Sequence, residues 1–189
     1  MNKKILNKIK EDTILLFDLD GTLINTDYSN FLAYKKAIDE AIGKISLEYN
    51  PKVRFNRDEL IKTFPNLKSD QLSKIIQLKE KYYNDFLIRT TVIKPTYDIL
   101  RQYFKTNTTI LVTASRESRA LAILDYHSLT NMLNHLIFKN EETDNKFECL
   151  FNTIEIDIKK SLLFENDETE IKNALKVGFP STNIIKIGL

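Results

Sequence analysis

The sequence contains little cysteine, glycine or proline. Its 189 residues include one cysteine, Cys149, so no disulfide can form within the chain. Only four glycines and four prolines interrupt it, and neither a low-complexity linker nor a repeat of fixed period separates two halves. We therefore expect a compact chain with few long loops, either one domain or a core domain with a modest insertion.

Long apolar runs and a strong net charge are also lacking. The basic stretch 1–10 is followed by an apolar run at 14–17 that is too short for a signal peptide. No segment is long and apolar enough to span a bilayer. The net charge of +2 indicates neither a nucleic-acid nor a membrane partner. With 42% hydrophobic residues the chain can bury a sizeable core. These features favour a soluble, cytoplasmic protein.

Short apolar runs alternate with helical patterns along much of the chain. Thr13–Leu19 is typical of a strand that is buried on both faces. Further strands are expected at 108–112, 135–138, 161–164 and 184–187, and helices at 96–104, 117–127, 146–153 and 169–177. Strands separated by helices predict a parallel sheet that is covered on both sides.

The stretch between the first two strands has a different, almost entirely helical pattern. Helices are predicted at Asn30–Ile42, at Arg57–Phe64, and from an N-cap at Ser69 through to Leu87. The fold class predicted is therefore α/β, with a three-layer, Rossmann-like core. The core would comprise residues 1–27 and 92–189, and residues 28–91 would form an all-helical cap insertion.

Two acidic residues follow the first predicted strand, in the run Asp18-Leu19-Asp20-Gly21-Thr22. Open parallel sheets bind ligands beyond the carboxyl ends of their strands, and residues two apart in an extended chain face the same side. Two crowded carboxylates invite a cation or a shared proton, and oxygen donors suit Mg²⁺. A helix–loop–helix calcium site would need a third acid and a preceding helix, and this sequence has neither.

The run of residues 18–22 resembles the Asp-x-Asp-Gly-Thr motif of the haloacid dehalogenase superfamily of phosphohydrolases. Three later segments also resemble its motifs, in the right order. These are the strand Ile110–Thr113, a lysine at a helix start, for which Lys146 fits better than Lys139, and the run Glu165-Asn166-Asp167 after a strand. The helical insertion resembles the small mobile cap of the phosphoglycolate phosphatase and β-phosphoglucomutase branch.

The resemblance implies a role for each of these residues. Asp18 would be the nucleophile that forms an aspartyl-phosphate, and Asp20 the general acid and base. Thr113 and Lys146 would also be catalytic. The phosphate would be bound by Gly21, Thr22, Thr113, Ala114 and Lys146, and Mg²⁺ by Asp18, the backbone carbonyl of Asp20, Glu165 and Asn166.

The fourth motif departs from the family pattern of two adjacent acids. Asn166 can offer its carbonyl oxygen to Mg²⁺, but with one fewer negative charge than an aspartate. A register slip of one residue would bring in Asp167 instead. This departure leaves open whether the metal site is weakened.

The resemblance predicts a Mg²⁺-dependent phosphatase that acts on a small phosphorylated metabolite. An aspartate at position 20 argues against dehalogenase and phosphonatase chemistry. Two alternatives remain open at this point. A phosphomutase of the same fold would use the same Asp18 and Asp20, and Asn166 would suit a catalytically weak binding protein. The sequence does not distinguish a monomer from a dimer.

Overall fold

The computed structural model describes residues 3–140, 142–143 and 145–188. The chain forms two compact units. One runs up to Ile24 and resumes at Val92, and the other is the intervening segment Asn25–Thr91. Each unit has its own hydrophobic core, and the two are therefore described separately below.

Helices and strands of the first unit alternate, as the sequence pattern predicts. Its elements are α1 (Lys3–Leu6), β1 (Ile14–Phe17), α5 (Lys94–Tyr103), β4 (Thr109–Thr113), α6 (Glu117–Tyr126), β5 (His135–Phe138), α7 (Lys146–Thr153), β6 (Ser161–Glu165), α8 (Glu168–Lys176) and β7 (Ile184–Lys186). Short 3₁₀ helices add η2 (Thr130–Met132), η3 (Ile158–Lys160) and η4 (Ser181–Asn183).

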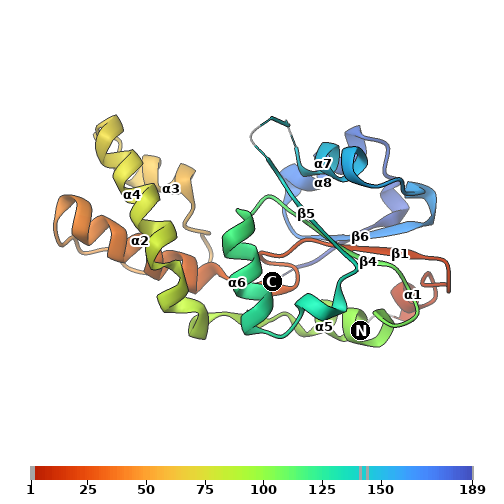
Figure 1. The fold of residues 1–189 in the computed structure, drawn as a ribbon. Coiled ribbons are helices and arrows are strands. Elements are labelled where there is room, and N and C mark those ends of the chain that lie inside the picture. Colours follow the sequence, from red (N-terminus) through yellow and green to blue (C-terminus); the bar gives the residue numbers. More distant parts are fainter. Residues whose placement is uncertain (1–2, 141, 144, 189) are drawn as a thin grey trace. The chain divides into compact units, whose positions relative to one another are not determined.

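The main sheet has five parallel strands in the order β5-β4-β1-β6-β7. Strand β1 is central, and Phe17 at its end is in register with Leu111 of β4 and Phe164 of β6. Figure 1 shows α7 and α8 on one side of this sheet and α5 and α6 on the other. The α/β fold class is thereby confirmed.

The core forms because side chains of each strand alternate between the two faces of the sheet. Leu16, Ile110 and Leu163 from three adjacent strands lie in one buried cluster with Phe147 of α7. On neighbouring strands, the rings of Phe17 and Phe164 stack with centroids 4.8 Å apart. Strands buried on both faces carry few polar residues, so the polar groups gather where the strands end.

The second unit is helical. It contains α2 (Asp27–Ile42), α3 (Arg57–Thr63), α4 (Ser69–Tyr82) and the 3₁₀ helix η1 (Tyr83–Arg89). Its buried core is built mainly from α2, to which Phe55, Leu60 and Ile75 add side chains. A separate pair of two-residue strands, β2 (Ile24–Asn25) and β3 (Thr91–Val92), forms where the chain passes between the units.

The last predicted helix of this segment differs from the structure at both ends. Its N-cap is Lys68 rather than Ser69, and the Gln71 side chain accepts a hydrogen bond from the Lys68 backbone N–H. The α-helix stops at Tyr82 and continues as the 3₁₀ helix η1. Apolar spacing did not reveal this change, because residues three apart share a face in both kinds of helix. None of the helices within the described residues is long and apolar enough to cross a membrane.

Candidate active site

Asp18 and Asp20 lie directly after β1, in a tight turn. The backbone carbonyl of Leu19 accepts hydrogen bonds from the N–H groups of the following residues 22–24. Gly21 has a φ of +83°, and a Cβ atom there would lie 2.4 Å from Nδ2 of Asn166. The left-handed backbone favours glycine at this position, and a Cβ atom would also displace the Asn166 side chain. The turn leaves Asp18 and Asp20 only 7% and 6% exposed.

Lys146 lies between two buried carboxylates. Its Nζ is 2.7 Å from Oδ1 of Asp18 and 2.6 Å from Oε2 of Glu165, and both Lys146 and Glu165 are 0% exposed. The sheet register brings the two acids together, because Phe17 and Phe164 are paired and Asp18 and Glu165 are the next residues. The N-cap Asn145, which accepts N–H bonds from residues 147 and 148, fixes the start of the helix that carries Lys146.

The pKa values of Asp18 and Lys146 are both raised in this arrangement. Burial raises the pKa of Asp18 to about 7, the charge of Glu165 acts in the same direction, and Lys146 opposes both. Burial alone would lower the pKa of Lys146, but the charges of Asp18 and Glu165 and their hydrogen bonds raise it above its ordinary value. Lys146 therefore stays protonated. Its positive charge favours the ionised form of Asp18, which burial and Glu165 disfavour.

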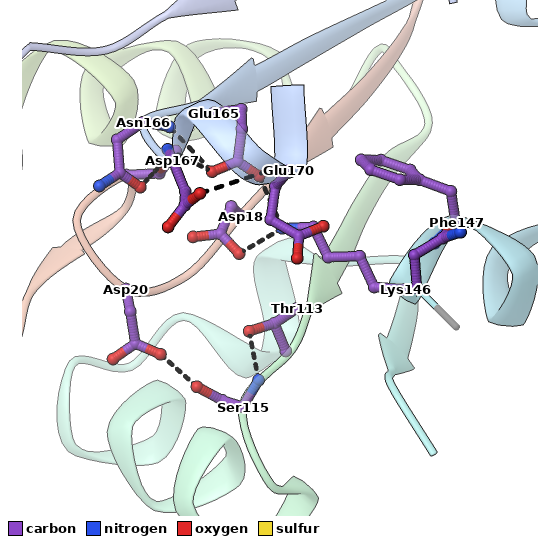
Figure 2. A network of polar contacts seen from close by, with 12 residues as sticks. Asp18, Asp20, Thr113, Ser115, Lys146, Phe147, Glu165, Asn166, Asp167 and Glu170 are labelled. Atoms are coloured by element: carbon purple, nitrogen blue, oxygen red, sulfur yellow. Dashed lines mark hydrogen bonds and ion pairs between the residues drawn. The ribbon is translucent and has the colours of Figure 1, made fainter. Parts of the chain in front are cut away.

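The carboxylate of Glu165 is hydrogen-bonded at both oxygens. Oε2 accepts from Lys146, and Oε1 accepts from the backbone N–H groups of Asn166 and Asp167 at 2.9 and 3.0 Å. Figure 2 shows these contacts at the end of β6. This side chain, predicted to bind metal, thus has protein partners that fix its position.

Asn166 and Asp167 have different environments. Oδ1 of Asn166 accepts a hydrogen bond of 3.1 Å from the hydroxyl of Thr22, so this side chain faces the turn after β1. Asp167 is the N-cap of α8, and its Oδ1 accepts from the N–H groups of Thr169 and Glu170 at 2.7 and 3.3 Å. Asp167 is exposed, and its carboxylate oxygen is engaged by the helix.

A second network holds Asp20. The hydroxyl of Ser115 donates to Oδ2 of Asp20, and Arg119 donates both to the same Oδ2, at 3.4 Å, and to Ser115. The hydroxyl oxygen of Thr113 accepts from the Ser115 N–H at 3.1 Å, which joins the end of β4 to this network. Ala114, predicted to bind phosphate, is exposed. Asp18 and Asp20 therefore have different side-chain partners, as Figure 2 shows.

Sequence reasoning did not identify Ser115, Arg119 or Glu170. The carboxylate of Glu170 points into the network drawn in Figure 2, and its Oε2 is buried with no hydrogen-bond partner among the described residues. Two spacings in the sequence were the available signals for these residues. Ser115 and Arg119 are four residues apart near a helix start, and Glu170 is four residues after Asn166. Neither spacing is informative without the fold.

The charges of the site are unbalanced. Five carboxylates are labelled in Figure 2, those of Asp18, Asp20, Glu165, Asp167 and Glu170. The cationic side chains that pair with them are Lys146 and Arg119. Within the part of the chain that the structure describes, no three His, Cys, Asp or Glu side chains are arranged to hold a metal ion by themselves. A cation here would therefore also need amide or backbone oxygens.

The family model for haloacid dehalogenase-like hydrolases matches residues 15–184, which is most of the chain. The chain belongs to this family. The matched range includes residues 18–22, the turn that holds Asp18 and Asp20. No curated protein sequence matches the chain significantly.

Solved structures of haloacid dehalogenase-like proteins have the same fold. A haloacid dehalogenase-like hydrolase from Streptococcus pneumoniae is 16% identical with a TM-score of 0.76, over 95% of this chain and 86% of that one. A predicted phosphoglycolate phosphatase from Haemophilus somnus is 16% identical, with a TM-score of 0.71 and coverages of 90% and 84%. A family hydrolase from Bacillus subtilis, solved with bound magnesium, is 15% identical, with a TM-score of 0.66 and coverages of 90% and 87%. At these identities the likeness concerns the fold alone.

Proposed function

We propose that this chain is a Mg²⁺-dependent phosphatase that hydrolyses a small phosphorylated metabolite through an aspartyl-phosphate on Asp18. The observation that carries the proposal is the buried Asp18 carboxylate held 2.7 Å from Lys146 at the end of the central strand. A second buried acid, Asp20, follows two residues later. A carboxylate nucleophile needs a fixed position and a nearby cation. In phosphoryl transfer the protein contributes mainly by positioning the reacting groups and stabilising their charge.

The residues present fit a magnesium ion. The site holds more carboxylates than cationic side chains, and the buried Oε2 of Glu170 has no hydrogen-bond partner among the described residues, so it could serve as an oxygen ligand. We assign the ion to Asp18, the backbone carbonyl of Asp20, the Asn166 amide oxygen and, directly or through water, Glu170. Glu165 was expected in this set, but its Oε2 accepts from Lys146 and its Oε1 from two backbone N–H groups, so we assign it to the support of Lys146. The Asn166 oxygen accepts one hydrogen bond, from Thr22, and would bind the ion with its second lone pair. When bound, Mg²⁺ would neutralise charge on the phosphoryl oxygens.

The side chains of this site supply the rest of the chemistry. An Asp18 oxygen attacks phosphorus, and the bond to the leaving alcohol oxygen breaks with its electron pair. Asp20 donates its proton to that oxygen and later takes one from the water that attacks the aspartyl-phosphate. The ammonium of Lys146 and the hydroxyl of Thr113 stabilise the phosphoryl oxygens as negative charge builds on them.

The substrate class rests on the family and on the second unit. The segment Asn25–Thr91 is a compact helical unit with its own core, and it resembles the small cap of the phosphoglycolate phosphatase and β-phosphoglucomutase branch. A structural neighbour described as a predicted phosphoglycolate phosphatase is in keeping with a small phosphate monoester as substrate.

The deciding experiment is a screen of phosphorylated metabolites for release of inorganic phosphate, with Mg²⁺ and with EDTA. We expect turnover of at least one monoester that requires Mg²⁺ and is abolished in Asp18→Asn, whose circular dichroism should match the wild type. Turnover that survives in Asp18→Asn would refute the assignment of the nucleophile. Isomer interconversion in place of phosphate release would identify a phosphomutase, and Mg²⁺ binding without any turnover a binding protein.

A further inference from the structure

Asp20 is held by two residues that the proposed reaction does not use directly. Ser115 is 4% exposed, Asp20 6%, and the Arg119 side chain 15%, so this network is largely shielded from water. Both Ser115 and Arg119 contact the same oxygen of Asp20, Oδ2, and they also contact each other. The three groups thus form a closed triangle of hydrogen bonds.

The triangle is built from three separate segments. Asp20 comes from the turn after β1, Ser115 from the loop after β4, and Arg119 from the first turn of α6. Strands β1 and β4 are paired, which brings the turn and the loop together. Thr113 anchors the loop by accepting the Ser115 N–H, so one short segment carries both a phosphate-site hydroxyl and a contact to Asp20.

Such a triangle restricts the rotation of a short side chain. An aspartate has two side-chain torsions, and charge-assisted bonds from a buried guanidinium are stronger than neutral ones. A guanidinium does not release its proton at ordinary pH, so Arg119 cannot itself transfer one. Beyond the effect of its charge, Arg119 can therefore contribute to proton transfer only through the position of Asp20.

We propose that Ser115 and Arg119 are positioning residues that aim the Asp20 carboxyl group at the oxygen of the leaving alcohol. This inference rests on the proposed phosphatase function. In the first step, the phosphorus–oxygen bond breaks as Asp18 attacks, and the Asp20 proton goes to the departing oxygen. In the second step, Asp20 recovers a proton from the attacking water while Asp18 is released. Misplacing Asp20 by about 1 Å would slow both transfers by up to roughly 100-fold.

Leaving groups that differ in their need for a proton test this role. An alkyl phosphate leaves as an alkoxide and needs the Asp20 proton, whereas p-nitrophenolate leaves without one. The value of kcat/KM reports the steps up to the first irreversible one, the transfer to Asp18, so slow hydrolysis of the aspartyl-phosphate does not enter it. The best alkyl phosphate of the screen is therefore compared with p-nitrophenyl phosphate.

We expect Ser115→Ala and Arg119→Ala to lower kcat/KM for the alkyl phosphate by roughly 10- to 100-fold. The value for p-nitrophenyl phosphate should stay close to that of the wild type. Asp20→Asn should show the same selective loss. Arg119→Lys, which keeps the positive charge but not the fork of donors, should recover part of the alkyl activity. Arg101→Ala and Ser118→Ala, which alter exposed residues of α5 and α6, serve as matched controls.

The two claims fail in different ways. Equal losses of kcat/KM on both substrates would mean that Ser115 and Arg119 have only a structural role. No loss on either substrate would mean that they have no role in the reaction. Either result overturns the positioning assignment and leaves the phosphatase function intact. Should Arg119→Ala not fold, Arg119→Lys and Ser115→Ala decide the question. If the wild type hydrolyses neither substrate, the phosphatase function itself is overturned, and the positioning role with it.

Discussion

At the scale of single residues, Lys146 is the group on which the site depends most. Its ammonium is fully buried and lies within 2.7 Å of two carboxylate oxygens from different strand ends. A buried ion pair adds little net stability, but removing one partner leaves the others as uncompensated buried charges. Lys146 therefore compensates the charges of both buried acids, Asp18 and Glu165.

Replacing this lysine with an apolar residue of similar length should destabilise the protein. We expect Lys146→Met to lower the free energy of unfolding by about 3–5 kcal/mol, because Asp18 and Glu165 would then face each other without a cation. Urea unfolding followed by circular dichroism measures the change. Adding Glu165→Gln should restore part of the loss, since it removes one of the two opposed charges.

The matched control is Lys139→Met, at the other lysine that sequence reasoning considered for this role. Lys139 is exposed, so its replacement should change stability by no more than about 0.5 kcal/mol. A Lys146→Met protein with the urea midpoint of the wild type would show that the buried pair is not formed in solution.

Residues of the site differ in how far the sequence could reveal them. Asp18, Asp20 and Lys146 are at positions set by strand ends and a helix start, and such positions can be read from apolar periodicity and a motif. Arg119 and Glu170 could not be read in this way. Arg119 acts through a contact to a residue 99 positions away, and the unpartnered oxygen of Glu170 becomes evident only when its surroundings are known.

At the scale of elements, two helix N-termini position the site. Asn145 caps α7, whose first residue is Lys146, and Asp167 caps α8, whose first turn carries Glu170. A capping side chain fixes where a helix begins, and thus the direction of the side chains in its first turn. The position of Asp167 in the sequence is compatible with a cap as well as with a metal ligand, and its contacts are those of a cap.

Two substitutions at Asp167 separate these two roles. Asp167→Ala should lower the free energy of unfolding by about 1 kcal/mol through loss of the cap, and Asp167→Asn should retain most of it, because asparagine also caps helices. The Mg²⁺ concentration for half-maximal turnover should be unchanged in Asp167→Asn. A rise in that concentration would place Asp167 in the metal site. Asn166→Asp is the positive control, since an added carboxylate should lower the Mg²⁺ concentration needed for half-maximal turnover.

The elements of the α/β unit were predicted more completely than those of the helical unit. Buried parallel strands have short, continuous apolar runs, and these placed β4, β5, β6 and β7 within about one residue at each end. In the helical unit the change from α4 to η1 was missed. Helix type there depends on hydrogen bonds within the backbone, which the apolar pattern of residues 69–89 does not specify.

At the scale of the whole molecule, the chain is two units with separate cores, and the candidate catalytic side chains all belong to one of them. The acids and cations come from the turn after β1, the ends of β4 and β6, and the first turns of α6, α7 and α8. Any ligand of these side chains that binds only the folded state should therefore stabilise the α/β unit.

Beryllium fluoride tests this consequence together with the identity of the nucleophile. With Mg²⁺ it mimics a phosphoryl group attached to a carboxylate, so it should inhibit turnover and raise the melting temperature of the wild type. At 100 times its dissociation constant such a ligand stabilises the folded state by about 2.7 kcal/mol. Asp18→Asn lacks the oxygen charge that the mimic requires and should show no rise. The control is Asp12→Asn, which changes an exposed acid two residues before the start of β1. This variant should behave as the wild type. An equal rise in Asp18→Asn would mean that the fluoride binds elsewhere, and the buried carboxylate beside Lys146 would then not be the phosphoryl acceptor.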